Sequence, residues 1–470
     1  MTGRPNILIV IADQLSASAL PAYGNQYART PNIDRILGRG VRFNRCYTNC
    51  PLCQPARAAL WTGRFPHTTG VLSNGRNHPV PPVPERLPAL GELFSAAGYE
   101  TMHLGKTHDA GSLRGFTVEP GGELPVDAEP AWPINSDTTR DRYTTTRAVE
   151  YLRGEPKRPF LAVVDLNNPH NICGWVGENA GPHRDVPVAV DLPPLPDNFE
   201  TADMAKRPLP VQYVCCSHRR LAQAAEWNED NYRHYLAAYT HYLHRVDAEI
   251  GLILDALEAR AGADNTLIVF MSDHGDGMAE HRQVTKQVSL YDNTTRIPLA
   301  FAGPGVEGAG RAVSSALVSN LDLLPTLCDY AGIEPPEELW GRSLLPWLRE
   351  ARDDSPHRYV VSEWHTEWGF TISPGRMLRT DRFKYVRYLE GMEQGLNQEF
   401  YDMQADPGET CNLIGHPAFQ DEIRRHRALL QMHIAETGDD FYSLDWLADP
   451  RWRSHTPGYQ YHRGPAAPVV

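Results

Sequence analysis

Positive charge, long hydrophobic runs and cysteines are all scarce in this chain of 470 residues. The chain has 45 lysines and arginines against 58 aspartates and glutamates, which gives a net charge of −13 and argues against a general nucleic-acid binder. The apolar run near the N-terminus, residues 7–12, is too short for a signal peptide or a membrane span. We therefore expect a cytoplasmic protein with neither a nucleic-acid nor a membrane partner.

The eight cysteines are too few and too scattered for the disulfide framework of a small secreted domain. Cys46, Cys50 and Cys53 do lie close together. No compact second ligand pair follows them, and their spacing matches no common zinc finger, so structural zinc is disfavoured. Apolar residues make up 41% of the chain, which is enough for a sizeable core.

Patterns of buried strands alternate with a helical pattern over the first 350 residues. Continuous apolar runs occupy residues 7–12, 160–166 and 267–271, and apolar side chains three and four apart fill residues 239–257. These patterns predict an α/β catalytic domain over residues 1–350, with a large, mixed, mostly parallel central sheet flanked by helices. The aperiodic segments around 117–140 and 182–210 are interpreted as surface loops.

The last part of the chain has a different pattern. Short strand-like pieces predict a smaller antiparallel sheet, followed by a helix near 417–436, and together these form a C-terminal α+β subdomain over residues 351–438. The tail, residues 439–470, carries four aromatic residues among prolines and glycines. We expect it to pack on the body or on a neighbouring subunit, which is compatible with a homo-oligomer.

Two carboxylates directly follow predicted buried strands. Asp13 and Asp273 should therefore lie at the carboxyl edge of the sheet, where open α/β proteins bind ligands. Their oxygens suit Ca²⁺, Mg²⁺ or Mn²⁺, and Gln14 and His274 can add an amide oxygen and an imidazole nitrogen. The alternative is that both acids simply cap loops.

Cys53 is a candidate nucleophile. Pro55 stands early in a run of good helix formers, so Cys53 should sit at a helix N-terminus, where the backbone favours anions and lowers the pKa of a thiol. Arg57, one turn later, can hold Cys53 or its anionic ligand. An isolated cysteine is otherwise an inert buried thiol.

Four further cationic or imidazole side chains could reach the same edge. Lys106 and His108 lie two residues apart on an extended or loop segment, His170 follows a buried strand, and Lys286 lies in a polar loop after Asp273. Each could contact one anionic group. Each would also be unremarkable as a structural or solvated residue.

The run from Cys53 through Pro55 and Arg57 to Thr62-Gly63 resembles the C-x-P-x-R…T-G signature of the formylglycine-dependent sulfatases, in the alkaline phosphatase superfamily. Most of the chain shares this resemblance, including residues 5–13, 105–108, 272–275 and 400–407. The resemblance implies an alkaline phosphatase-like fold and the hydrolysis of sulfate esters to an alcohol and inorganic sulfate. The metal-site pattern is most similar to that of choline sulfatases and phosphonate monoester hydrolases.

The resemblance also implies a role for each candidate. A formylglycine-generating enzyme would oxidise Cys53 to formylglycine, whose hydrated aldehyde attacks the sulfur of the sulfate ester. Asp13, Gln14, Asp273 and His274 would bind Ca²⁺, and Lys106 and Lys286 would neutralise the charge of the sulfate. His170 would donate a proton to the leaving alcohol, and His108 would accept one from the second hydroxyl. Arg57 would orient the formylglycine, and Asn74 would contact the substrate.

Other functions stay open at this level. Gln14 stands where a second aspartate is usual in sulfatases, and His274 stands where asparagine is frequent. The pairs Asp13-Gln14 and Asp273-His274 resemble those of choline sulfatases and phosphonate monoester hydrolases, so a phosphonate monoester hydrolase or phosphodiesterase is the alternative enzyme. Lys106 and His108 favour sulfate, because the phosphonate enzymes tend to lack that pair. An unmodified, catalytically silent anion-binding module is the alternative from a different class. A thiol phosphatase is disfavoured because no C-x5-R loop surrounds Cys53.

Overall fold

The computed structural model describes most of the chain, and the account below is confined to residues 4–74, 80–122, 138–154, 158–179, 192–200, 206–208, 210–211, 224, 227–286, 289–352, 354–365, 373–389 and 395–443. Most of the expected C-terminal tail, residues 444–470, lies outside the described residues. Much of the two expected surface loops, around 117–140 and 182–210, lies outside the described residues as well.

The centre of the molecule is a nine-stranded mixed sheet with the order β4-β3-β5-β1-β6-β7-β2-β8, and β9 pairs with β2 at its side. Only β7 runs antiparallel to its neighbours β6 and β2; every other pairing is parallel. The expected fold class is confirmed. The strands are β1 (Asn6–Ala12), β2 (Val41–Tyr47), β3 (Glu100–Gly105), β4 (Thr117–Pro120), β5 (Phe160–Leu166), β6 (Thr266–Met271), β7 (Arg296–Ala302), β8 (Arg311–Val313) and β9 (Val318–Ser319).

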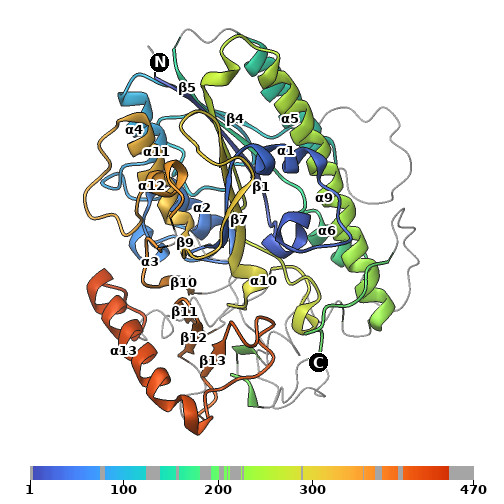
Figure 1. Cartoon of the computed structure of the whole chain (residues 1–470), viewed down its shortest axis with the longest axis vertical. Coiled ribbons are helices and arrows are strands. Elements are labelled where there is room, and N and C mark those ends of the chain that lie inside the picture. The colour runs from blue at the N-terminus through green and yellow to red at the C-terminus, as the bar shows by residue number, and fades with distance from the viewer. Residues whose placement is uncertain are drawn as a thin grey trace.

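Helices cover both faces of this sheet (Figure 1). Alternation along β1 explains why both are needed: Leu8 and Val10 enter one core cluster, whereas Ile7 and Ile9 enter the other. The first cluster is packed by α1 (Pro31–Arg39), α5 (Thr138–Arg153), α6 (Ile172–Glu178) and the 30-residue α9 (Glu229–Glu258). The second is packed by α2 (Cys53–Thr62), α4 (Leu90–Ala96), α11 (Leu323–Ala331) and α12 (Leu345–Arg349).

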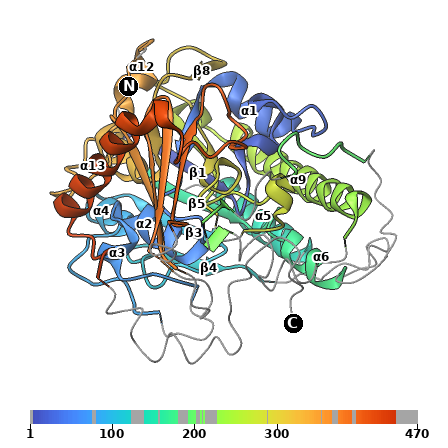
Figure 2. The same cartoon turned by 90° about the horizontal axis from the view of Figure 1, so that it is seen from below.

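A second, four-stranded antiparallel sheet follows in the chain order β10-β11-β12-β13. In Figure 1 this second sheet and α13 (Gln420–Thr437) lie below the main body, and Figure 2 shows that α13 runs along the sheet. The sheet contacts the main body through β10, which packs on β2 and β9. Its strands are β10 (Val360–Trp364), β11 (Gly375–Arg379), β12 (Phe383–Tyr388) and β13 (Gln398–Asp402), and the short helices α3 (Pro66–Thr69) and α10 (Asp292–Thr295) complete the described α-helices.

One expectation from the sequence is wrong in part. The segment around 117–140 was expected to be a loop, but Thr117–Pro120 forms β4, paired in parallel with β3 at the edge of the main sheet, and α5 begins at Thr138. A four-residue edge strand with exposed side chains carries no hydrophobic signal, so its pairing is not visible in the sequence.

The topology places the candidate residues at one edge. Strands β1, β3, β5 and β6 are parallel, so the residues that follow their carboxyl ends meet on the same side of the sheet. Among the described helices, none is both long and apolar enough to cross a membrane.

Candidate active site

The nucleophile candidate begins a helix, as the sequence predicts. Helix α2 starts at Cys53, after an extended Leu52, and ends at Thr62, before Gly63, which adopts the left-handed conformation. The side chain of Asn74 accepts a hydrogen bond from the backbone N–H of Gln54 at 3.0 Å, which satisfies a free donor of the first turn. Asn74 therefore holds the start of this helix, and its expected contact with substrate stays a prediction.

Cys53 is fully buried and is surrounded by cations. Its Sγ lies 3.1 Å from Nε2 of His274 and 3.1 Å from Nζ of Lys286. Burial raises the pKa of the Cys53 thiol, but the charges of Lys286 and Lys106 outweigh it and leave the pKa well below its ordinary value. This environment is suited to an anion, since the groups that stabilise a thiolate also stabilise a bound oxyanion.

Arg57 is the fully buried centre of a carboxylate cluster. Its Nη2 donates to Asp13 at 2.9 Å, its Nε donates to Asp273 at 3.1 Å, and its Nη1 donates to Asp165. The guanidinium thus fixes two of the four expected metal ligands, Asp13 and Asp273, whereas the sequence predicted that it would hold Cys53 or its ligand. Orientation of the oxidised residue by Arg57 stays a prediction.

The residues expected to bind a cation do converge. Ligand atoms of Asp13, Asp273 and His274 lie, with Cys53 Sγ, within 4.8 Å of one another. Oδ1 of Asp13 is buried and has no hydrogen-bond partner among the described residues. An unpaired buried carboxylate oxygen is costly unless a cation or water meets it, so this group fits a hard divalent ion such as Ca²⁺.

We call Asp13, Cys53, Asp273 and His274 the cation group; His274 is oriented within it, and Gln14 lies beside it. The Nδ1 of His274 donates to the carbonyl of Gly275 at 2.8 Å, which directs Nε2 toward Cys53. The side-chain oxygen of Gln14 accepts from Lys286 at 2.8 Å, and its backbone N–H donates to Asp273 at 3.1 Å. Gln14 therefore borders the cation group, and direct ligation by its oxygen stays a prediction.

A second acidic group, formed by His67, Glu363 and Asp439, is less suited to a metal. Glu363 accepts from Nδ1 of His67 at 2.6 Å, and both carboxylate oxygens of Asp439 accept from Arg376 at 2.7 Å. These carboxylates are already paired with cations. The group joins helix α3 to the C-terminal sheet and is a buried ion-pair network.

Lys106, His108 and His170 reach the same site. Gly105 ends β3 at φ 104°, and a Cβ there would lie 2.2 Å from the carbonyl oxygen of Asp165, so only glycine allows the approach that positions the next residues. Nζ of Lys106 donates to Asp13. Burial, Lys106 and Lys286 lower the pKa of His170 to about 3, so in the free site this imidazole is neutral.

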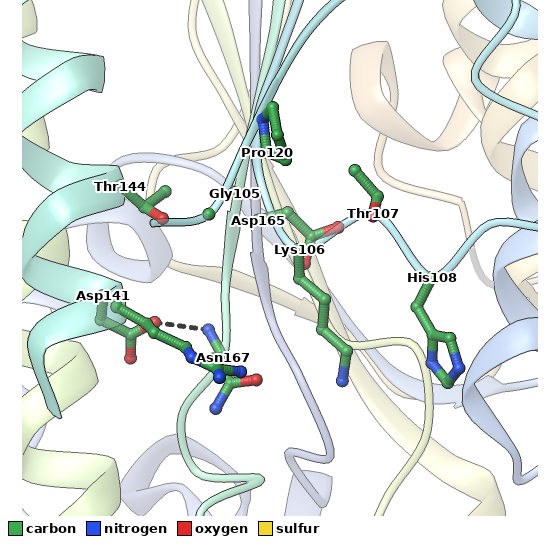
Figure 3. Close-up of a pocket in the computed structure, with 11 residues that line it drawn as sticks. Gly105, Lys106, Thr107, His108, Pro120, Asp141, Thr144, Asp165 and Asn167 are labelled. Carbon is green, nitrogen blue, oxygen red and sulfur yellow. Dashed lines mark hydrogen bonds between the residues drawn. The ribbon is translucent and has the colours of Figure 1, made fainter. Parts of the chain in front are cut away.

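A cavity of about 330 Å³ opens beside Lys106 and His108 (Figure 3). It lies between the ends of β3 and β5 and the first turn of α5, which contributes Arg140 and Asp141. Its volume is within the range of small-molecule sites. By contrast, Trp175, Trp227 and Trp364 are buried in the core clusters and do not line this cavity.

Sequence reasoning missed three residues of the site. Asp165 is the sixth residue of β5 and reads as part of an apolar run, and Asp276 follows the recognised Asp273-His274 pair by two residues. Tyr235 lies on α9 among other buried aromatics. A charged residue inside an otherwise apolar strand is a signal that could have identified Asp165, because a buried charge requires a partner.

Comparison with known families decides the class of this site. The model of the sulfatase family matches residues 5–333, and that of the C-terminal part of N-sulphoglucosamine sulphohydrolase matches residues 279–436. The chain belongs to the sulfatase family. Membership agrees with the expected fold and identifies the protein as a hydrolase of sulfuric esters.

Individual sulfatases resemble this chain over nearly its whole length. It is 50% identical, over 99% of its length and 96% of the relative, to a Δ4,5-hexuronate-2-O-sulfatase of Bacteroides thetaiotaomicron. It is 30% identical, over 88% and 79%, to arylsulfatase K of Gallus gallus. The structure of a 2-O GAG sulfatase superposes with a TM-score of 0.89 at 49% identity, covering 98% of both chains.

A phosphonate monoester hydrolase of Agrobacterium radiobacter also has the sulfatase fold. Its structure superposes with a TM-score of 0.75 over 92% of this chain and 96% of its own, at 24% identity. At that identity the likeness concerns the fold alone.

Proposed function

We propose that this sulfatase removes the 2-O-sulfate of a Δ4,5-hexuronate, with a formylglycine derived from Cys53 and a bound Ca²⁺. The observation that carries the substrate is the 50% identity, over 99% of the chain, to a relative of that activity. The observation that supports the cofactors is the convergence of Cys53 with Asp13, Asp273 and His274 in one buried group.

In this proposal the cations bind the sulfate. Lys286, 3.1 Å from the Cys53 sulfur, and Lys106, bonded to Asp13, flank the position of the sulfate group. When bound, Ca²⁺ polarises sulfate oxygens, and oxidised Cys53 supplies a hydrated aldehyde as nucleophile. Arg57 keeps Asp13 and Asp273 in place for the ion.

The histidines carry protons. His170 would donate a proton to the ester oxygen, which would leave as an alcohol, and His108 would accept the proton of the second hydroxyl of the oxidised Cys53 as the sulfate is released and the aldehyde re-forms. The pKa of His170 is lowered by burial and by the two lysines. A sulfate anion bound between those lysines would offset their charge and raise this pKa, which favours the protonated form of His170 that the donor role needs.

The cavity beside Lys106 is proposed to receive the sugar. Arg140, Asn167 and backbone groups line it, and such polar groups suit a hydroxyl-rich, carboxylated ring. The proposal therefore predicts selectivity for a uronate over a neutral sulfated alcohol.

A substrate panel tests the proposal. Protein co-expressed with a formylglycine-generating enzyme is assayed for sulfate release from a 2-O-sulfated Δ4,5-hexuronate disaccharide and a 6-O-sulfated one, and for alcohol release from a monoester of phenylphosphonate. We expect the 2-O-sulfate to react with the highest kcat/KM. Preference for the 6-O-sulfate overturns the proposed substrate, and preference for the phosphonate overturns the sulfate assignment.

Mass spectrometry tests the nucleophile separately. The tryptic peptide that contains Cys53 should carry the aldehyde after co-expression, and a Cys53→Ala variant should lose turnover of a nitrophenyl sulfate. A plain thiol in a fully active preparation contradicts the formylglycine role. A plain thiol in an inactive preparation favours the silent anion-binding module.

A further inference from the structure

The amide of Gln14 has a defined orientation. Its Nε2 donates to Oδ2 of Asp276 at 2.6 Å, and its Oε1 accepts from Nζ of Lys286 at 2.8 Å. An ionised carboxylate can only accept a hydrogen bond, and an ammonium group can only donate one. The two contacts, one on each side of the amide, therefore both direct the Gln14 oxygen toward Lys286 and the cation group.

Asp276 is itself held firmly. The side chain is fully buried, and its Oδ1 accepts from the hydroxyl of Tyr235 and from the backbone N–H of Met278 at 3.0 Å. Its own backbone N–H donates to Oγ of Ser16 at 2.8 Å. The three groups that donate to this carboxylate, on Tyr235, Met278 and Gln14, are all neutral.

Tyr235 connects this carboxylate to the loop that bears Lys286. Its hydroxyl oxygen accepts from the backbone N–H of Thr285 at 2.8 Å while its proton goes to Asp276. Tyr235 lies on the long helix α9, one turn before Tyr239, whose hydroxyl donates to the backbone carbonyl of Gln14 at 2.6 Å. Helix α9 thus fixes both ends of the chain Tyr235–Asp276–Gln14.

The charge of Asp276 has a consequence for the cation group. Asp13 and Asp273 are both bonded to Arg57, and Asp13 is also bonded to Lys106, so much of their charge is already compensated. Gln14 adds a dipole and no charge. Asp276, one hydrogen bond behind Gln14, adds a negative charge to the same side of the site.

We propose that Asp276 is a positioning residue for the cation of this sulfatase: it aims the Gln14 oxygen at the site and supplies, through the amide, the negative charge that Gln14 lacks. This inference rests on the proposed function, because it presumes a bound divalent cation. Hydrogen-bond partners behind metal ligands are typically worth about 10- to 100-fold in metal affinity.

Calcium affinity tests the inference without reference to turnover. Calorimetric titration of the purified, chelator-treated protein with Ca²⁺ is compared for the wild type and Asp276→Asn. We expect Asp276→Asn to weaken Ca²⁺ binding about 10- to 100-fold. Unchanged affinity overturns the inference.

A rescue variant separates a charge effect from a structural one. In the double variant Gln14→Asp with Asp276→Asn, the negative charge is moved directly next to the cation, and we expect Ca²⁺ affinity to return to within about threefold of the wild type. Failure of this rescue in a folded protein overturns the charge role. Tyr235→Phe, which keeps the charge of Asp276 but removes the hydroxyl that donates to Asp276 and accepts from Thr285, should weaken Ca²⁺ binding about two- to tenfold and decides the matter if Asp276→Asn does not fold.

Glu399 provides the matched control. It is also a buried carboxylate that accepts from tyrosines, Tyr291 at 2.8 Å and Tyr401 at 2.7 Å, but it lies on β13 of the C-terminal sheet. Glu399→Gln should leave Ca²⁺ affinity unchanged; an equal loss there contradicts a specific role for Asp276. If the wild type binds no Ca²⁺, Mg²⁺ or Mn²⁺, the metal-dependent proposal itself fails, and the inference fails with it.

Discussion

Replacement of Arg57 by methionine is the most direct test of the buried charge cluster. Arg57 donates to Asp13, Asp165 and Asp273, and all four side chains are fully buried. Methionine is similar in length, so it fills most of the space and introduces no polar group. The measured effect is then mainly that of three carboxylates left without their shared cation.

The expected magnitude follows from these contacts. One charge-assisted hydrogen bond contributes about 1.5–3 kcal/mol, but the three share one guanidinium and are not additive. Lys106 still compensates Asp13 after the change. We therefore expect Arg57→Met to lower the free energy of unfolding by about 3–5 kcal/mol, the usual cost of breaking a buried ion pair.

Urea unfolding followed by tryptophan fluorescence, in the presence of a chelator, measures this loss. Arg35→Met is the control: Arg35 also pairs with two acids, Asp255 at 2.8 Å and Glu258 at 3.0 Å, but at the surface, where the loss should stay below about 1 kcal/mol. The deficit of Arg57→Met should also shrink at acid pH, because unpaired buried carboxylates gain protons readily. Equal losses for the two variants would refute the reasoning.

Three further predictions concern other parts of the molecule. Gly40→Ala should destabilise the protein by about 1–3 kcal/mol, because a Cβ would lie 1.9 Å from a carbonyl oxygen of β7, whereas Gly38→Ala, in open space on α1, should be neutral or stabilising; urea midpoints compare the two. Burial lowers the pKa of His67, but Glu363 raises it above the ordinary value overall, so the stability from this pair is complete below about pH 6.5 and is lost as the pH rises through the raised pKa. His67→Gln should therefore show its largest stability deficit near pH 6 and a smaller one in alkaline buffer, and a deficit that grows with pH would contradict the pairing. Among the described cysteines only Cys411 is exposed, so peptide mapping after brief iodoacetamide treatment should find it labelled before the buried Cys46, Cys50, Cys173 and Cys328, and faster labelling of one of these would argue against the structure there.

Local sequence patterns predicted the strands and helices that carry strong hydrophobic signals. The runs at 7–12, 160–166 and 267–271 are β1, β5 and β6, which pair in parallel as expected. Weak signals failed: β4 has exposed side chains, and only its pairing with β3 makes it a strand. The antiparallel direction of β7 likewise depends on which neighbours it meets.

The amino-acid sequence by itself determined which residues stand at the ends of strands and at the start of a helix, because those positions depend on neighbours a few residues away. Asp13, Cys53 and Asp273 are local features of this kind. Only the tertiary structure decided that Arg57 bonds Asp165, that Asp276 holds Gln14, and that His67 pairs with Glu363. These partners lie 108, 262 and 296 residues apart in the chain, and only the order of strands in the main sheet and the packing of the C-terminal sheet against it bring them within hydrogen-bond distance.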